Sequence, residues 1–103
     1  MISVEQNVKP HYAWEGVWIA IPAYNEANTI RDLAKRALMQ CRRVIVIDDG
    51  STDGTAAQLH GLPIMLLRHE HNKGKAASLR TAFTYALEKD ACCVISMDGD
   101  AQH

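Results

Sequence analysis

The stretch Val44-Ile-Val-Ile-Asp48-Asp49-Gly50-Ser51-Thr52-Asp53-Gly54-Thr55 decides how this chain folds. Its four apolar, β-branched residues predict a strand that is buried on both faces, as strands of parallel sheets are. The strand runs straight into two carboxylates, a glycine and residues that commonly cap helices. Because ligands of open α/β sheets bind at the carboxyl ends of the strands, Asp48 and Asp49 lie where a ligand is expected.

The composition of the chain excludes several classes of protein. Its 103 residues suit one small domain or part of a larger one. A net charge of -1, with acids and bases interspersed, gives no electrostatic signature of nucleic-acid binding or of a polybasic membrane arm. No apolar run approaches the roughly 18 residues of a transmembrane helix, and the N-terminus has no basic segment followed by an apolar one. We therefore expect a soluble, cytoplasmic chain with no nucleic-acid partner.

The three cysteines are Cys41, Cys92 and Cys93. An odd number without a C-x-x-C spacing predicts neither a disulfide framework nor a zinc site. We expect all three to be small core residues in a reducing compartment.

Strands and helices alternate along the chain after a leader, residues 1–16, that either lies against the domain or is disordered. The expected strands span 17–21, 44–49, 63–68 and 91–97, and the helices between them end near Gln40, near His60 and past Leu87. This order predicts an α/β fold with a parallel sheet of about four strands and helices on both faces. Pro22 is expected to stop the first strand, because proline cannot donate to a sheet ladder.

Two of the predicted helices have a clear apolar face. Asn25 is a plausible N-cap for the first helix, and Ser51 or Thr52 for the second. The apolar positions of the first and third helices recur at the spacing of one helical face. They are Ile30, Leu33, Ala34, Ala37, Leu38 and Cys41 in the first, and Leu79, Ala82, Phe83, Ala86 and Leu87 in the third.

Every predicted strand is followed by polar residues at its carboxyl end. These are Tyr24, Asn25 and Glu26, then Asp48 and Asp49, then the loop 69–75, and finally Asp98 and Asp100. One polar strand end is ordinary loop chemistry, whereas four on the same edge of a parallel sheet predict a cleft.

Asp98 and Asp100 are candidate metal ligands. They lie two residues apart with Gly99 between them, which can direct both carboxylates to one side. Hard divalent cations such as Mg²⁺ and Mn²⁺ take oxygen ligands, usually one or two carboxylates plus substrate phosphates. An Asp-Gly turn that only caps the chain is the alternative for the dipeptide alone, but the predicted cleft favours a metal. Gln102 or His103 could supply a further ligand.

Most of the other polar residues at the cleft could have either a binding role or a structural one. Of Asp48 and Asp49, we expect one to accept hydrogen bonds from a base or ribose and the other to fix the turn through backbone amides. Tyr24 either stacks on a base or packs the loop. Arg68, Lys73 and Lys75 lie near a helix start that suits phosphate, although each alone is more often a solvated charge. His69 and His71 are expected to be surface histidines.

Four motifs together resemble the family 2 glycosyltransferases of the GT-A fold. They are Ile21-Pro-Ala-Tyr-Asn-Glu26, Asp48-Asp-Gly-Ser-Thr-Asp-Gly-Thr55, Asn72-Lys-Gly-Lys-Ala76 and Asp98-Gly-Asp-Ala-Gln-His103. The resemblance covers about residues 17–103, and the chain also resembles the polyprenyl-phosphate sugar transferase branch of the family. This resemblance implies a Rossmann-like GT-A domain of which these residues form the nucleotide-sugar-binding half, truncated after the DxD motif.

The resemblance also implies roles for individual residues. Asp98, Asp100 and Gln102 would hold Mg or Mn against the diphosphate of the donor. Tyr24 and Asp49 would contact the base, and the donor pocket would be lined by Pro22, Glu26, Asp48, Lys75 and Asp98.

The reaction implied is an inverting, metal-dependent sugar transfer. The donor would be a UDP- or GDP-linked sugar and the acceptor a polyprenyl phosphate or a saccharide. The catalytic base and the acceptor site are expected beyond His103, and with them a peripheral association with the inner face of the membrane. The alternative is a non-catalytic nucleotide-binding module. Gly74-Lys75 lacks the upstream glycine of a P-loop, and no G-x-G-x-x-G, G-x-S-x-G or kinase signature is present.

Overall fold

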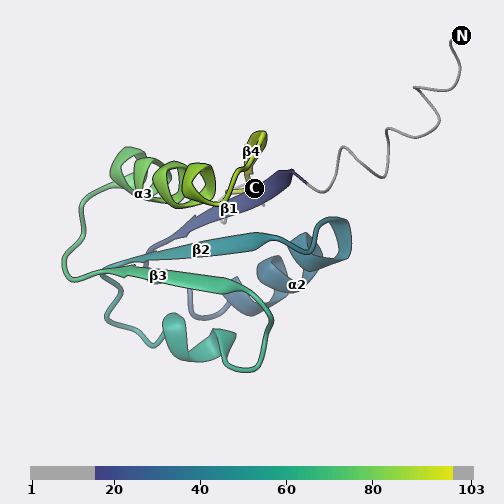
Figure 1. Ribbon diagram of the computed structural model, residues 1–103. Helices are drawn as coiled ribbons and strands as arrows, with labels where there is room; N and C mark the ends of the chain where they lie inside the picture. The colour runs from purple at the N-terminus through teal and green to yellow at the C-terminus, as the bar shows by residue number, and fades with distance from the viewer. Residues whose placement is uncertain (1–15, 99–103) are drawn as a thin grey trace, which may run out of the picture.

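A computed structural model describes residues 16–98 of the chain (Figure 1). The predicted leader, apart from Gly16, therefore lies outside the described residues, as do Asp100 and Gln102. The elements are β1 (Val17–Ala23), α2 (Ile30–Gln40), β2 (Val44–Asp49), the 3₁₀ helix η1 (Ala56–Leu59), β3 (Met65–His69), α3 (Lys75–Glu88) and β4 (Cys93–Ser96).

The four strands form one parallel sheet in the order β3-β2-β1-β4. Figure 1 shows α2 on one side of this sheet and α3 on the other. The predicted Rossmann-like α/β arrangement, with a parallel sheet and helices on both faces, is therefore confirmed. None of the helices within residues 16–98 combines the length and the apolar character that a membrane span requires.

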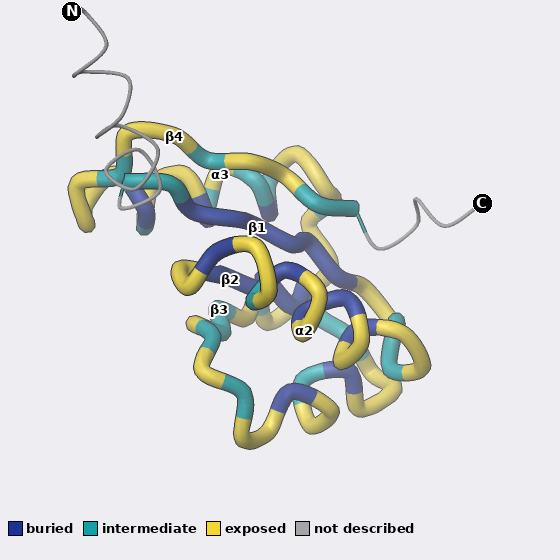
Figure 2. The backbone as a smooth tube through the Cα atoms, turned by 90° about the vertical axis from the view of Figure 1, so that its right-hand side faces the viewer, coloured by how far each residue is buried: buried dark blue, intermediate teal, exposed yellow. Residues whose placement is uncertain are grey.

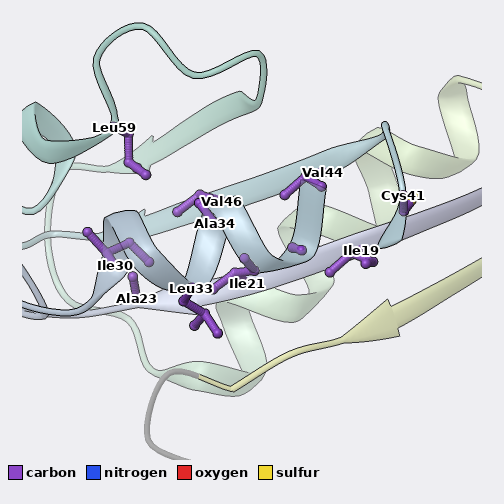
Figure 3. Packing of buried hydrophobic residues seen from close by; sticks show 11 residues of the cluster. Ile19, Ile21, Ala23, Ile30, Leu33, Ala34, Cys41, Val44, Val46 and Leu59 are labelled. Carbon is purple, nitrogen blue, oxygen red and sulfur yellow. The ribbon is translucent and has the colours of Figure 1, made fainter. Parts of the chain in front are cut away.

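Two hydrophobic clusters cover the two faces of the sheet. Val44 and Val46 pack with residues of α2 on one face, as Figure 3 shows, whereas Ile45 and Ile47 pack with residues of α3 on the other. In Figure 2 the central strands β1 and β2 are buried along their length, and β4 forms a largely exposed edge. The alternation continues past the core, so Asp48 falls on the α2 side and Asp49 on the α3 side.

The first strand does not stop at Pro22 but continues to Ala23. The amide of Ile19 donates to Arg43 on the β2 side of β1, and the carbonyl of Ala20 accepts from Met97 on the β4 side. Pro22 has the same parity as Ala20, so its missing amide faces β4. The pairing of β1 with β4 ends at Ala20, and proline costs no ladder hydrogen bond at position 22.

The helix starts differ from those predicted. α2 begins at Ile30 after Thr29, and Asn25 is not its cap, because Asn25 has a φ of 51° and uses its side chain elsewhere. The helix expected from Ser51 or Thr52 shrinks to the single turn η1, whose N-cap position is Thr55. The amide of Thr55, which a helix starting at Ser51 would bond within itself, donates instead to the side chain of Asp53.

The buried face of α3 consists of small residues. Ser78, Ala82 and Ala86 lie four apart and are buried, so the helix packs closely on the sheet. Phe83 and Leu87, predicted to be buried, are 39% and 66% exposed. The larger residues Leu79 and Tyr85 flank this small-residue stripe and pack against the same cluster, whereas Phe83 and Leu87 lie on the exposed side of the helix.

The cysteine prediction is confirmed for Cys41 and wrong for the other two. Cys41 is buried, with its sulfur 3.1 Å from the carbonyl oxygen of Val17. Cys92 and Cys93 are exposed, because they lie at the start of the edge strand β4, where no further element of residues 16–98 covers them.

Candidate functional site

A cavity of about 220 Å³ lies at the carboxyl edge of the sheet. Most of the residues predicted for a donor site come together around it. The lining residues are Pro22, Ala23, Tyr24, Glu26, Asp49, Asn72, Gly74, Lys75, Ser78 and Asp98. Asp48 is the one described residue of the predicted pocket that does not line the cavity.

The strand order explains why the cavity forms there. The chain passes from β1 outward to β2 and β3, then crosses back through α3 to β4 on the other side of β1. The helices α2 and α3, through which the chain moves to either side of β1, lie on opposite faces of the sheet, and a crevice is expected where the strand order reverses between β1 and β4. The cavity thus occupies the topological switch point, where ligands of open α/β sheets bind.

The loop after β1 is anchored to the loop after β2, residues 50–55. The amide of Asn25 donates to the hydroxyl of Ser51 at 2.8 Å, and the amide of Thr52 donates to the side-chain oxygen of Asn25 at 2.9 Å. The φ of 51° at Asn25 is a conformation that asparagine tolerates better than most residues. These reciprocal bonds set the direction in which Tyr24 leaves β1.

Glu26 is held by the same loop. Its amide donates to the Thr55 hydroxyl at 2.9 Å, and the next amide, of Ala27, donates to Asp53 Oδ2 at 3.1 Å. Asp53 Oδ1 in turn accepts from the amide and the hydroxyl of Thr55. The hydrogen bond from the Thr55 hydroxyl is the main reason that the pKa of Asp53 lies below its usual value.

Replacing Asp53 with asparagine is expected to loosen the loop that carries Tyr24 and Glu26. Asparagine is uncharged and keeps only one acceptor oxygen, so either Ala27 or Thr55 loses its acceptor and the other keeps a weaker, neutral one. Hydrogen exchange of the amides of Ala27 and Thr55 should become severalfold faster. Asp32→Asn, at an exposed position on α2, is the control and should leave both amides unchanged; equal rates in Asp53→Asn and wild type would contradict the anchoring role.

Asp49 binds the loop between β3 and α3. Its Oδ1 accepts from the amide of Lys73 at 2.9 Å, and its Oδ2 from the amide of Gly74 at 2.8 Å. The side chain of His69, its register partner on β3, lies with Nδ1 2.7 Å from Oδ1. Burial alone would raise the pKa of Asp49, but these hydrogen bonds outweigh it and hold that pKa below its usual value.

His69 corrects the expectation of two surface histidines. His71 is exposed, as predicted, but only 9% of the His69 side chain is accessible. The Nε2 atom of His69 lies 2.9 Å from the hydroxyl of Thr81 on α3. Sequence reasoning missed this role because it depends on the pairing of β2 with β3, which places His69 beside Asp49.

Asp48 is fully buried on the opposite face of the sheet. Its Oδ1 accepts from the amide of Ser51 at 3.0 Å, and its Oδ2 lies 3.3 Å from Nε of Arg68. The structure thus gives Asp48 the turn-fixing position and leaves Asp49 at the cavity.

Lys75 and Asp98 both line the cavity and are in direct contact. Nζ of Lys75, in the first turn of α3, forms an ion pair with Oδ2 of Asp98, which follows β4. One third of the Asp98 side chain is exposed. A partly exposed carboxylate at the edge of a polar cavity has the chemistry that Mg²⁺ or Mn²⁺ requires. Within residues 16–98 no three acidic, histidine or cysteine side chains group as a metal site, and the other two predicted ligands lie outside that range.

Four lining residues had no predicted role: Ala23, Asn72, Gly74 and Ser78. The loop before α3 contributes Asn72 and Gly74 to the cavity, and the first turn of α3 contributes Ser78. Gly74 has a φ of 98°, and its carbonyl accepts from the hydroxyl of Ser78 at 3.1 Å. For Asn72 and Gly74 the signal was present in the sequence, because Asn72-Lys-Gly-Lys-Ala76 is one of the four motifs of the resemblance; Ser78 lies beyond that motif.

The chain matches known proteins over most of its length. Residues 18–103 match the family described as Glycosyl transferase family 2. A UDP-N-acetylglucosamine--dolichyl-phosphate N-acetylglucosaminyltransferase of Methanococcus voltae is 27% identical over 84% of this chain and 42% of its own length. An undecaprenyl-phosphate 4-deoxy-4-formamido-L-arabinose transferase of Proteus mirabilis is 30% identical over 84% of this chain and 29% of its own length.

A poly-beta-1,6-N-acetyl-D-glucosamine synthase of Staphylococcus aureus is 27% identical over 82% of this chain and 23% of its own length. The chain thus spans well under half the length of the curated relatives it matches. The match covers the sheet from Trp18 onward and every lining residue of the cavity. By this match and its Rossmann-like α/β fold, the chain belongs to glycosyl transferase family 2.

Proposed function

We propose that this chain binds the donor in a metal-dependent, inverting transfer of a sugar from a nucleoside diphospho-sugar. The observation that carries the proposal is the cavity at the switch point of the sheet. It gathers Tyr24 from the end of β1, Asp49 from β2, Lys75 from α3 and Asp98 from the end of β4. An aromatic ring, a hydrogen-bond acceptor, a cation and a metal-ligand candidate are the groups that a base, a diphosphate and a divalent ion require.

The donor would lie across the cavity with its base near β1 and β2. Tyr24 is 46% exposed at the cavity, so its ring is available for stacking on a base. Asp49 would accept a hydrogen bond from that base. Pro22 and Glu26 would line the donor pocket, and Asp48 would support it by fixing the turn beneath.

The diphosphate would lie toward α3 and β4. Lys75 stands in the first turn of α3, where the helix dipole favours an anion. Asp98, together with Asp100 and Gln102, would hold Mg or Mn. That ion, when bound, supplies neutralisation of the charge on the leaving diphosphate.

The acceptor is proposed from the printed names of the relatives. Two of them name polyprenyl phosphates, dolichyl phosphate and undecaprenyl phosphate, and a third names a polysaccharide. A polyprenyl phosphate is therefore our first proposal for the acceptor, with a saccharide as the second. A lipid acceptor would place the enzyme at the inner face of the membrane.

Binding of UDP or GDP, measured by calorimetry with and without Mn²⁺, tests the proposal. We expect Mn²⁺ to strengthen binding by about tenfold or more, because it adds charge stabilisation at the diphosphate. The double variant Asp98→Ala, Asp100→Ala should lose this gain and keep the metal-independent binding.

Asp32→Ala is the matched control, since it removes an exposed carboxylate on α2 away from the cavity. It should respond to Mn²⁺ like the wild type. If Mn²⁺ strengthens binding equally in the double variant, the metal assignment is wrong. If neither nucleotide binds the wild type, the donor site itself is wrong.

A further inference from the structure

We propose that His69 is a positioning residue of the donor site: it fixes the Asp49 carboxylate so that one lone pair remains directed to a ring N–H of the nucleobase. The inference rests on the proposed function, because it concerns the base that the cavity accepts. Uracil and guanine carry such a ring N–H, whereas cytosine presents an unprotonated ring nitrogen at the corresponding position.

The contacts of His69 join three elements. Nδ1 lies 2.7 Å from Asp49 Oδ1 at the end of β2, and Nε2 lies 2.9 Å from the Thr81 hydroxyl on α3. His69 itself ends β3, and its side chain is 9% exposed. The imidazole is therefore a nearly buried link between the carboxylate and the helix that begins at the cavity.

The hydrogen positions follow from the partners. Asp49 is an ionised acceptor, so Nδ1 of His69 carries a hydrogen and donates it. The Thr81 hydroxyl has one hydrogen, which goes either to Nε2 or to the carbonyl of Ala77 at 3.1 Å. In the first case His69 is neutral, and in the second it is an imidazolium that donates from Nε2. Both arrangements keep the Nδ1 donor on Asp49.

Counting acceptor sites shows what remains for a ligand. The two oxygens of an ionised carboxylate offer about four lone-pair sites. His69 and Lys73 occupy two on Oδ1, and Gly74 occupies one on Oδ2. Asp49 lines the cavity, so the remaining site, on Oδ2, is the one available to a ligand.

His69 supplies a rigidity that the two amides do not. Lys73 and Gly74 belong to one loop, and the carboxylate could shift together with that loop. The bond from His69 instead ties Oδ1 to the sheet and, through Thr81, to α3. Loss of this bond should weaken recognition of the base and leave recognition of the diphosphate intact.

The experiment compares two variants of His69, each of which is expected to keep one of its two side-chain contacts. His69→Asn places an amide donor near the position of Nδ1 and retains the contact with Asp49. His69→Gln reaches toward Thr81 and gives up that contact. His71→Ala, at an exposed position two residues away, is the control. The ligands are UDP, CDP and inorganic pyrophosphate, each measured with Mn²⁺ by calorimetry.

We expect His69→Gln to bind UDP roughly tenfold more weakly than wild type, the loss of one hydrogen bond to a charged group. His69→Asn should stay within about threefold, and His71→Ala should match the wild type. Pyrophosphate affinity should be the same in all four proteins. The preference of the wild type for UDP over CDP should shrink in His69→Gln.

Three results would overturn the inference: unchanged UDP affinity in His69→Gln, equal losses in the Asn and Gln variants, or equal losses of UDP and pyrophosphate. The last would indicate general damage to the fold. Failure of the wild type to bind UDP and GDP is a different result, because it would remove the proposed function and the role of His69 with it.

Discussion

Asp49→Asn is expected to lower the free energy of unfolding by about 3 kcal/mol, because hydrogen bonds to charged groups contribute about 1.5 to 3 kcal/mol each. The wild-type carboxylate accepts from Lys73, Gly74 and His69. An asparagine amide places a donor group against at least one of these donors, whichever way it is turned. Since Asp49 is 3% exposed, water replaces the lost partner poorly.

The difference in the free energy of unfolding between wild type and Asp49→Asn should be larger at neutral pH than in acid. The pKa of Asp49 is lower in the folded chain than its ordinary value, so the carboxylate stabilises the fold above the unfolded pKa of about 3.9. That stabilisation is lost as the pH falls through the folded-state pKa. The gap between wild type and Asp49→Asn is therefore expected to be full at neutral pH and to close below about pH 4.

Urea unfolding of both proteins at several pH values measures this gap. Asp32→Asn is the control, since its exposed carboxylate lies in the first turn of α2 and should contribute no more than about 1 kcal/mol. Two results would show that Asp49 does not hold the β3–α3 loop. One is a loss of unfolding free energy in Asp49→Asn as small as that in Asp32→Asn, and the other is a loss that grows as the pH falls.

Gly50→Ala is expected to destabilise the chain by a similar amount, about 3 kcal/mol, from two separate costs. Gly50 has a φ of 77°, a conformation that costs an alanine about 1 to 2 kcal/mol. A Cβ there would also lie 2.6 Å from the amide nitrogen of Asn72 and 2.6 Å from the carbonyl carbon of His71. The overlap is with backbone, so the β3–α3 loop must move away from β2.

Gly54→Ala separates the two costs. Gly54 has a φ of 86°, but a Cβ there meets nothing within 4 Å. It should therefore lose only the conformational part, about 1 to 2 kcal/mol. Urea unfolding should rank wild type above Gly54→Ala and Gly54→Ala above Gly50→Ala. Equal losses of stability in the two variants would mean that the close approach of the two loops is unimportant. UDP binding should also fall mainly in Gly50→Ala.

Much of the fold was predictable because its signals are local. The β-branched run at 44–47 predicted a buried strand, and the alternation of strands with helices predicted the parallel sheet. The polar strand ends predicted a cleft at the carboxyl edge, where the structure has a cavity. The wrong predictions concern apolar residues and cysteines at the periphery of the hydrophobic core. The burial of Phe83, Leu87 and Cys92 depends on which neighbours cover them, and helical periodicity cannot say which apolar stripe meets the sheet.

For the candidate site too, some features follow from local sequence and others from the tertiary structure. The sequence by itself determined which residues stand at the strand ends, because a strand and the turn that follows it are encoded within a few residues. Only the tertiary structure decided what each side chain does there. The pleat sends Asp48 beneath one face and Asp49 to the other, and the pairing of β2 with β3 brings His69 onto Asp49. Such contacts join residues twenty or more positions apart, so their distances are set by the packed sheet and not by the local chain.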